Sequence, residues 1–163
     1  MTVATIPSTT LYPARKGEHS LTAEDIWAVP RVGSPVPSPD GTRLAVTVTR
    51  YDLEKNTGRG RIWLVPLPAG GQKSGEPRPP PSAEVSSSDP AFSPDGRRLV
   101  FTRKVNGGKA QLHVMPLDGG EAQKLTDLPL GAFDPTWLPD GSGIVFATHL
   151  IRGHLTVEAT QAE

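Results

Sequence analysis

Two aspartates are the first residues whose type and spacing suggest chemistry. Asp89 and Asp134 occupy the same position of a repeat, and each stands directly before a proline. A carboxylate can serve as a general acid or base, but a catalytic carboxylate is expected once and not in every repeat. We therefore interpret both as structural residues that accept hydrogen bonds from backbone amides where a strand starts.

The histidines do not form a metal-binding pattern. His149 and His154 lie close in the sequence, but a metal site needs three or four ligands and no carboxylate shares their spacing. His113 stands between two apolar residues and is interpreted as a structural histidine of a strand, whereas His19 belongs to the polar N-terminal segment. We assign no catalytic, cofactor-binding or metal-ligating residue, and we expect no cofactor.

Arginines are the remaining candidates for a functional role. Arg50, Arg103 and Arg152 follow the second strands of successive repeats at similar places. They fit a salt-bridged row on the surface, which we favour, or the entrance of a channel, where they would steer a charged peptide substrate. The three tryptophans are too far apart in the sequence to form a stacking platform and are interpreted as packing residues.

The elements that must position these residues are strands joined by a recurring turn. Pro-Asp-Gly occurs within residues 38–41, 93–96 and 138–141, preceded by serine in the first two copies and by Leu138 in the third. Proline fixes φ, aspartate bonds its own backbone and glycine supplies a positive φ, so each copy predicts a tight hairpin. We expect the third turn to lose one side-chain hydrogen bond and still to form.

The strand after each turn is apolar on both faces, as in residues 99–101 and 144–146. A sheet with one face in water would alternate more cleanly, so both faces are expected to be covered. The turn aspartates stand at positions 40, 95 and 140, and these intervals fit one propeller blade each. The predicted fold is all-β: an incomplete β-propeller of about two and a half four-stranded blades with a short N-terminal helix.

The repeat divides the chain into expected segments. Residues 1–20 are a flexible arm, and residues 21–31 a short helix with Thr22 as its N-cap. Residues 32–163 are the partial propeller, with blade one at about 32–83, blade two at about 84–128 and a partial blade three at about 129–163. Within blade one, the proline-rich residues 73–88 predict an exposed loop, which we interpret as a tolerated insertion in preference to a functional loop.

Composition excludes several classes of protein. The 17 Lys and Arg balance the 17 Asp and Glu, so the charge expected of a protein that binds nucleic acid or an acidic membrane is missing. The lack of cysteine excludes disulfides and cysteine-based zinc sites. No apolar run is long enough for a signal peptide or a membrane span. We expect a cytoplasmic protein.

The segment Leu21–Ile26, which reads Leu-Thr-Ala-Glu-Asp-Ile and precedes Ser-Pro-Asp-Gly blades, resembles the N-terminal part of the prolyl oligopeptidase family of serine peptidases. The acylaminoacyl-peptidase-like branch is the most similar. The resemblance covers about residues 21–149 and implies a seven- or eight-bladed propeller followed by an α/β-hydrolase domain. Periplasmic Tol-type propellers share the blade motif, and the Leu-Thr-x-Glu-Asp lead-in favours the peptidases.

The resemblance also marks what the chain lacks. The nucleophile-elbow pattern Gly-x-Ser-x-Gly does not occur, and the family's catalytic serine, aspartate and histidine lie in the missing domain, so none is assigned to a residue here. We expect the 163-residue chain alone to be inactive, as a fragment of a longer enzyme. Because so few blades cannot close a ring, the isolated chain is expected to be marginally stable, aggregating or oligomeric.

The function implied by the resemblance is that of a serine peptidase that hydrolyses short or N-acylated peptides, with this part gating substrate access. The implied partners are the missing C-terminal α/β-hydrolase domain, the remaining blades, a short peptide substrate and, in an oligomer, further copies of the chain. Neither nucleic acid nor membrane is expected as a partner. Ile26 and Trp27 are expected to pack against the hydrolase domain. The alternative is a non-catalytic Tol-type or WD-repeat-like propeller that binds a protein partner.

Overall fold

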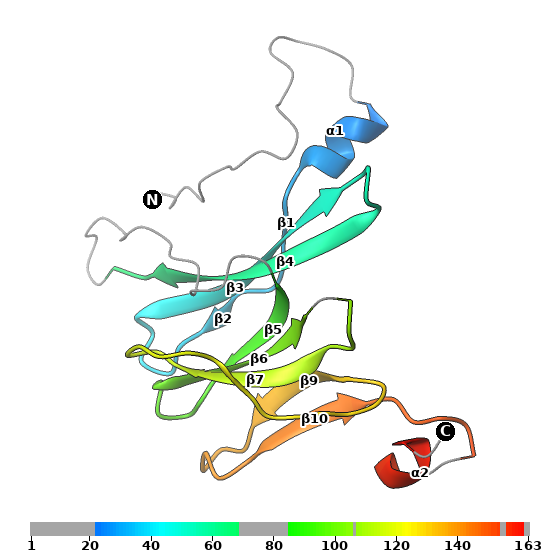
Figure 1. The fold of residues 1–163 in the computed structure, drawn as a ribbon. Helices are drawn as coiled ribbons and strands as arrows, with labels where there is room; N and C mark the ends of the chain where they lie inside the picture. The colour runs from blue at the N-terminus through cyan, green and yellow to red at the C-terminus, as the bar shows by residue number, and fades with distance from the viewer. Residues whose placement is uncertain (1–21, 69–84, 106, 154–155, 162–163) are drawn as a thin grey trace.

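A computed structural model describes residues 22–68, 85–105, 107–153 and 156–161. Within them the chain forms three antiparallel sheets that follow one another along the sequence and pack in that order (Figure 1). The expected arm at residues 1–20 and most of the expected loop at 73–88 lie outside the described residues. In the part of the chain that the structure describes, no helix is long and apolar enough to cross a membrane.

The first helix, α1, spans Ala23–Ala28 and has the predicted N-cap. The Thr22 hydroxyl accepts a hydrogen bond from the Asp25 amide at 3.3 Å, and the Asp25 carboxylate accepts one from the Thr22 amide at 2.9 Å. This reciprocal capping box satisfies amides that the first helical turn leaves without a partner. Arg31 already belongs to the first strand, so the helix is shorter than the expected segment of residues 21–31.

The first sheet has a long hairpin and an interrupted inner strand. It contains β1 (Arg31–Val32), β2 (Val36–Pro37), β3 (Arg43–Asp52) and β4 (Thr57–Pro66). β3 pairs with β4 along its full length, and β1 and β2 both pair with the opposite edge of β3. Together β1 and β2 therefore take the place of one inner strand.

The second sheet has four strands in sequence order: β5 (Ser86–Phe92), β6 (Arg98–Lys104), β7 (Gln111–Pro116) and β8 (Gln123–Lys124). This up-and-down order is that of a propeller blade. Both faces of β6 are buried, as its apolar run predicts, because Leu99, Val100 and Phe101 are each at most 1% exposed.

The third sheet is smaller and more open. It contains β9 (Ala132–Trp137) and β10 (Ile144–Thr148), and it is followed by the short helix α2 (Val157–Gln161). Val145 is 59% exposed and Phe146 is 38% exposed. The covering of both faces that the sequence predicts for this strand is therefore not observed, and the sequence did not predict α2.

The three recurring turns have the same backbone geometry. Gly41, Gly96 and Gly141 have φ angles of 68°, 68° and 71°, in the left-handed region that glycine adopts most readily. The amide of each glycine donates to the carbonyl oxygen of the first turn residue, at 2.9, 2.8 and 2.9 Å. The turn prediction is confirmed in all three copies.

Side chains complete the turns in two different ways. In the first copy the Ser38 hydroxyl donates to Asp40 at 2.5 Å and accepts from the Arg43 amide at 3.0 Å. In the third copy a later residue, Ser142, donates to Asp140 at 2.7 Å. The aspartate of the third turn thus still accepts a hydrogen bond from a hydroxyl, although Leu138 has none to donate.

These hydrogen bonds stabilise the charged form of the turn aspartates. The Ser38 hydroxyl, followed by the Thr42 amide, lowers the pKa of Asp40 from 3.8 to about 2. The hydroxyl of Ser93 is the largest cause of the lowered pKa of Asp95. The turn aspartates therefore serve the local structure, as the sequence predicts.

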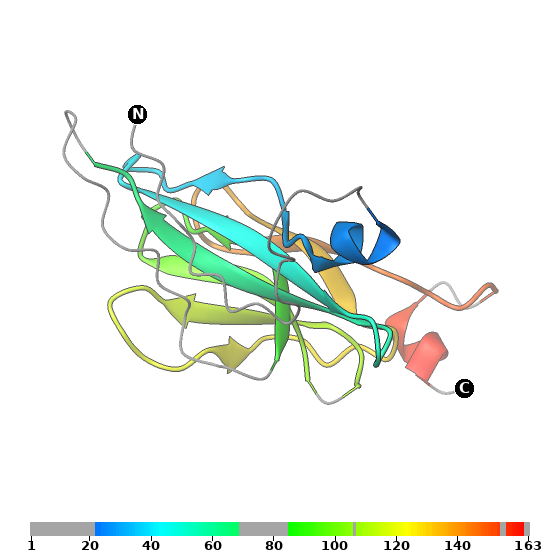
Figure 2. The same cartoon turned by 90° about the horizontal axis from the view of Figure 1, so that it is seen from above.

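The main core lies between the first and second sheets. Its buried residues are Ala45, Ile62, Phe92, Leu99, Phe101 and Met115. A second, smaller cluster of Val46, Val48 and Trp63 lies on the other face of the first sheet. The sheets overlie one another when the molecule is seen from above (Figure 2), and their packing through these apolar clusters makes the fold all-β and propeller-like.

Candidate functional site

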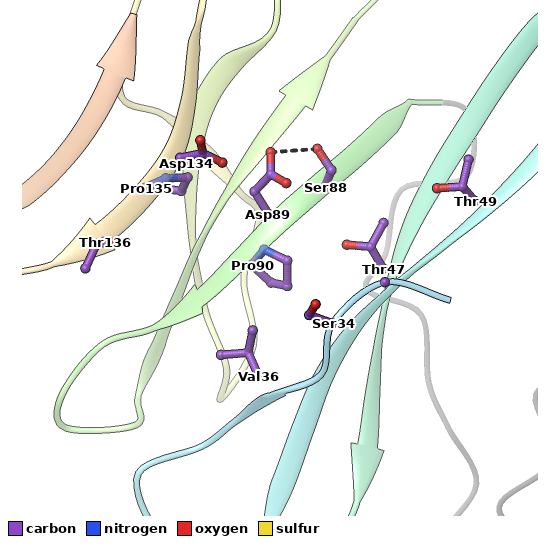
Figure 3. Close-up of a pocket in the computed structure, with 11 residues that line it drawn as sticks. Ser34, Val36, Thr47, Thr49, Ser88, Asp89, Pro90, Asp134, Pro135 and Thr136 are labelled. Atoms are coloured by element: carbon purple, nitrogen blue, oxygen red, sulfur yellow. Dashed lines mark hydrogen bonds between the residues drawn. The ribbon is translucent and has the colours of Figure 1, made fainter. Parts of the chain in front are cut away.

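A groove of about 520 Å³ crosses the inner strands of all three sheets. Its walls come from the connection between β1 and β2, from β3, and from the middle of β5 and β9. Asp89 and Asp134 come from neighbouring inner strands and both line the groove, together with Ser34 (Figure 3). The groove therefore brings together the aspartates that occupy the same position in successive repeats.

Each inner strand carries one extra residue at its proline. Residues 32–36 lie opposite residues 45–48 of β3, residues 88–91 opposite 100–102 of β6, and residues 133–136 opposite 145–147 of β10. Such a bulge redirects a side chain without ending the strand pairing. Ser34, Asp89 and Asp134 each stand seven residues before the turn glycine (41 − 34, 96 − 89, 141 − 134), so the groove is lined by one repeated position.

The backbone explains why aspartate recurs there. Asp89 and Asp134 have φ angles of 51° and 50°, in the left-handed region that aspartate and asparagine enter more easily than other residues with a Cβ. The predicted hydrogen bonds to backbone amides were wrong. The Asp89 carboxylate accepts a hydrogen bond from the Ser88 hydroxyl at 3.0 Å, and no hydrogen bond joins the Asp134 carboxylate to the residues that the structure describes.

The groove has carboxylates and hydroxyls at its surface but no cation. Its hydroxyls belong to Ser34, Thr47, Thr49, Ser88 and Thr136, and none of the described residues that line it is lysine, arginine or histidine. The lining can accept hydrogen bonds from amide and amino groups, but it holds no nucleophile beside a histidine base. Nor do three His, Cys, Asp or Glu side chains gather as metal ligands within the described ranges.

The three arginines predicted to form a row do not line this groove. Arg50 lies in β3 opposite Arg59, Arg103 lies at the end of β6 opposite Gln111, and Arg152 follows β10. They stand nine, seven and eleven residues after the turn glycines (50 − 41, 103 − 96, 152 − 141), so their positions are not equivalent. Arg103 lines a second cavity, and a role of the three in substrate steering stays a prediction.

The structural interpretation of His113 and Trp63 agrees with their burial. His113 is 7% exposed and Trp63 is 9% exposed. The Nδ1 atom of His113 lies 3.2 Å from the carbonyl oxygen of Gln111, and burial is the largest cause that lowers the pKa of the His113 imidazole. His149 packs on the ring of Phe133 with 4.8 Å between centroids. His19 and His154 lie outside the described residues.

The chain is similar to parts of larger proteins. No family model matches it. The uncharacterized peptidase YuxL of Bacillus subtilis is 41% identical over 133 residues, which are 82% of this chain and 20% of YuxL. The Tol-Pal system protein TolB of Anaeromyxobacter dehalogenans is 34% identical over 104 residues, 64% of this chain and 21% of TolB. This chain thus spans about a fifth of the length of these curated relatives.

A solved structure shares the fold. The acylaminoacyl peptidase of Pyrococcus horikoshii superposes on 74% of this chain and 17% of its own, with a TM-score of 0.54 and 22% sequence identity. At that identity the superposition establishes the fold alone. A fold like that of most of this chain therefore occurs within a much longer chain.

Proposed function

Because the chain is a propeller-type segment of the prolyl oligopeptidase family of peptidases, we propose that it gates substrate access in a serine peptidase that hydrolyses short or N-acylated peptides. In this proposal bond cleavage takes place in a C-terminal α/β-hydrolase domain, through an acyl-enzyme. The segment described here sets which peptides reach that domain. A cytoplasmic location belongs to the same proposal.

The groove across the three inner strands is the observation that carries the proposal. In a propeller the inner strands surround a central channel. A rigid channel of limited width admits an extended peptide and excludes a folded chain, so its lining controls access without taking part in the chemistry. The lining described above, which accepts hydrogen bonds and holds no nucleophile–base pair, suits that role.

The exposed apolar side chains of α1 support the proposal that another domain packs against this segment. Ile26 is 50% exposed and Trp27 is 39% exposed, although Trp27 also packs edge-on against Tyr51 with 5.2 Å between ring centroids. A helix of six residues has little stability of its own. We propose that the hydrolase domain covers this surface and that further blades complete the ring.

A fluorophosphonate probe tests the class of enzyme, because it reacts with an activated serine. We expect the complete gene product to be labelled and the 163-residue chain to stay unlabelled. If neither the complete gene product nor the 163-residue chain is labelled, the assignment to an active serine peptidase is overturned. Labelling of the 163-residue chain alone would overturn the separation of gating from catalysis.

Gating is tested by narrowing the groove in the complete gene product. We expect Ser34→Tyr to lower kcat/KM for an eight-residue peptide several-fold more than for a dipeptide amide, because the added ring obstructs the longer chain. Ser142→Tyr, at an exposed turn residue outside the groove, is the matched control and should change neither. An equal effect of Ser34→Tyr on both substrates would contradict the gating role.

The second candidate is a non-catalytic propeller that binds a protein partner. The 34% identity to TolB of Anaeromyxobacter dehalogenans supports it. This candidate predicts no fluorophosphonate labelling of the complete gene product. It also predicts a specific protein complex that loop substitutions weaken.

A further inference from the structure

A second cavity, of about 480 Å³, lies beside the second sheet and is separate from the inner-strand groove. We call it the basic pocket and define it by Arg103, Lys109, Gln111, His113, Lys124 and Asp127. Strand pairing brings these residues together, because Arg103 is the partner of Gln111 and His113 is the partner of Lys124. Nothing in the proposed gating role uses this pocket.

The wall of the basic pocket is held by a closed hydrogen-bond network around Gln111, which is 7% exposed. The Gln111 amide group donates to the Leu128 carbonyl oxygen at 2.8 Å and accepts from the Leu128 amide at 3.1 Å. It also accepts from the Thr126 hydroxyl at 2.8 Å. The segment that carries Asp127 is therefore fixed to β7, and the shape of the pocket is built before any ligand arrives.

More basic than acidic side chains line the pocket. Of the residues that line it, Arg103, Lys109 and Lys124 are cations, and Asp127 is an anion that pairs with Lys124. The Arg103 guanidinium lies 4.9 Å from the centroid of the Phe101 ring, within the range of a cation–π contact. Guanidinium and ammonium groups are the donors that proteins use for carboxylates and phosphates.

We propose that the basic pocket binds a small organic anion that carries carboxylate or phosphate groups. The cavity is within the size range of small-molecule sites. Val105 and Leu128 provide apolar wall for the body of the ligand, while Arg103, Lys109 and Lys124 contact its charged groups. His113 completes the site from β7.

His113 gives the site a proton-linked signature. Its Nδ1 atom faces the Gln111 carbonyl oxygen, so Nε2 is the ring atom left to face a ligand. Burial is the largest cause that lowers the pKa of the His113 imidazole; the hydrogen bond to Gln111 opposes it, and the nearby Arg103 and Lys124 add to it. An anion beside the ring favours the imidazolium, so His113 is expected to contribute proton uptake to binding.

Calorimetric titration of the complete gene product with citrate and with inorganic phosphate tests the site. The titration is made at constant ionic strength, with sodium chloride as the reference. We expect one site per chain, with Lys109→Gln and Lys124→Gln each weakening binding by about two- to fivefold, as for a single exposed charge contact. Lys104→Gln is the matched control, because Lys104 lies beside Arg103 but does not line the pocket. It should leave the affinity unchanged.

The outcomes separate the sources of the anion and decide the proposal. Binding of citrate alone identifies a carboxylate ligand, binding of phosphate alone identifies a phosphate ligand, and proton uptake that is lost in His113→Gln places either one beside the imidazole. If neither anion gives more heat than the sodium chloride reference, the proposed site is overturned. An equal loss in Lys104→Gln and Lys109→Gln also overturns it, because it shows only a general attraction of anions.

Discussion

The backbone amide of Gly60 donates a hydrogen bond of 3.1 Å to the hydroxyl of Ser86 and so joins β4 of the first sheet to β5 of the second. The contact needs a residue without a side chain, because a Cβ on residue 60 would lie 2.8 Å from the Ser87 carbonyl oxygen. That oxygen belongs to the backbone and cannot move aside alone. The close approach of the two sheets therefore depends on glycine at this position.

Gly60→Ala should separate the two sheets locally. We expect it to lower the free energy of unfolding by about 1–3 kcal/mol, the usual range for overpacking, as measured by urea denaturation. Gly33→Ala, in the connection between β1 and β2, is the matched control, since its Cβ would meet its nearest atom at an ordinary 3.5 Å. Equal effects of the two substitutions would show that the close approach does not limit stability.

Trp137 joins the third sheet to the second. Its Nε1 donates to the Ala91 carbonyl oxygen at 3.2 Å, and the Arg98 guanidinium lies 4.6 Å from its ring centroid. A double-mutant cycle of Trp137→Leu with Arg98→Gln should show a coupling of about 0.5–1 kcal/mol, the strength of an exposed cation–π contact. The same cycle with Arg97→Gln, at the neighbouring exposed residue, should show none. Similar coupling in both cycles would refute the specific contact.

The fold was predictable where local chemistry decides it. Pro-Asp-Gly fixes its own dihedral angles, so the three hairpins and the order of the strands followed from the sequence. The exposure of Val145 did not, because the covering of an apolar face depends on whatever packs against it and not on the strand itself. The role of Gly60 could not be predicted either, since the close approach of two sheets depends on residues far apart along the chain.

The left-handed backbone of Asp89 and Asp134 makes a prediction about substitution. Asparagine tolerates that conformation and alanine does not. At either position we expect asparagine to change the free energy of unfolding by less than about 0.5 kcal/mol and alanine to lower it by about 1 kcal/mol.

Thermal denaturation measures both changes, with Asp118→Ala as the control at an exposed aspartate outside the left-handed region. If asparagine proved as destabilising as alanine, the carboxylate and not the backbone would explain the recurrence.

The groove was only partly predictable. The recurrence of aspartate before proline at residues 89 and 134 was visible, and counting back from the turn glycines would have added Ser34 to the same position. What the sequence does not contain is the bulge, which requires knowing which residues face each other across two strands. Arg103 was selected as part of a row along the repeats, but strand pairing places it beside Gln111 in the basic pocket.

The hydrogen bond from the Ser38 hydroxyl to Asp40 should make the free energy of unfolding depend on pH in the acidic range. It is the largest of several causes that lower the pKa of Asp40 from 3.8 to about 2, so its stabilising effect on the charged aspartate is complete above 3.8 and is lost as pH falls toward 2. Ser38 is also 3% exposed and accepts a hydrogen bond from the Arg43 amide at 3.0 Å, a contact that does not titrate. Ser38→Ala should therefore lower the free energy of unfolding by about 1–2 kcal/mol at pH 7, and by less at pH 2.5.

The pKa of Asp40 itself, followed through the NMR signal of its carboxyl carbon, should rise toward 3.8 in Ser38→Ala. Ser142→Ala is the matched control in the third turn, where an exposed serine donates to Asp140 at 2.7 Å. Ser142→Ala should likewise raise the pKa of Asp140. Because Ser142 is not buried, we expect this substitution to cause little of the pH-independent loss in unfolding free energy that Ser38→Ala should retain in acid. A stability difference between Ser38→Ala and the unmodified protein that widens as pH falls would have the wrong sign for this linkage and would rule it out.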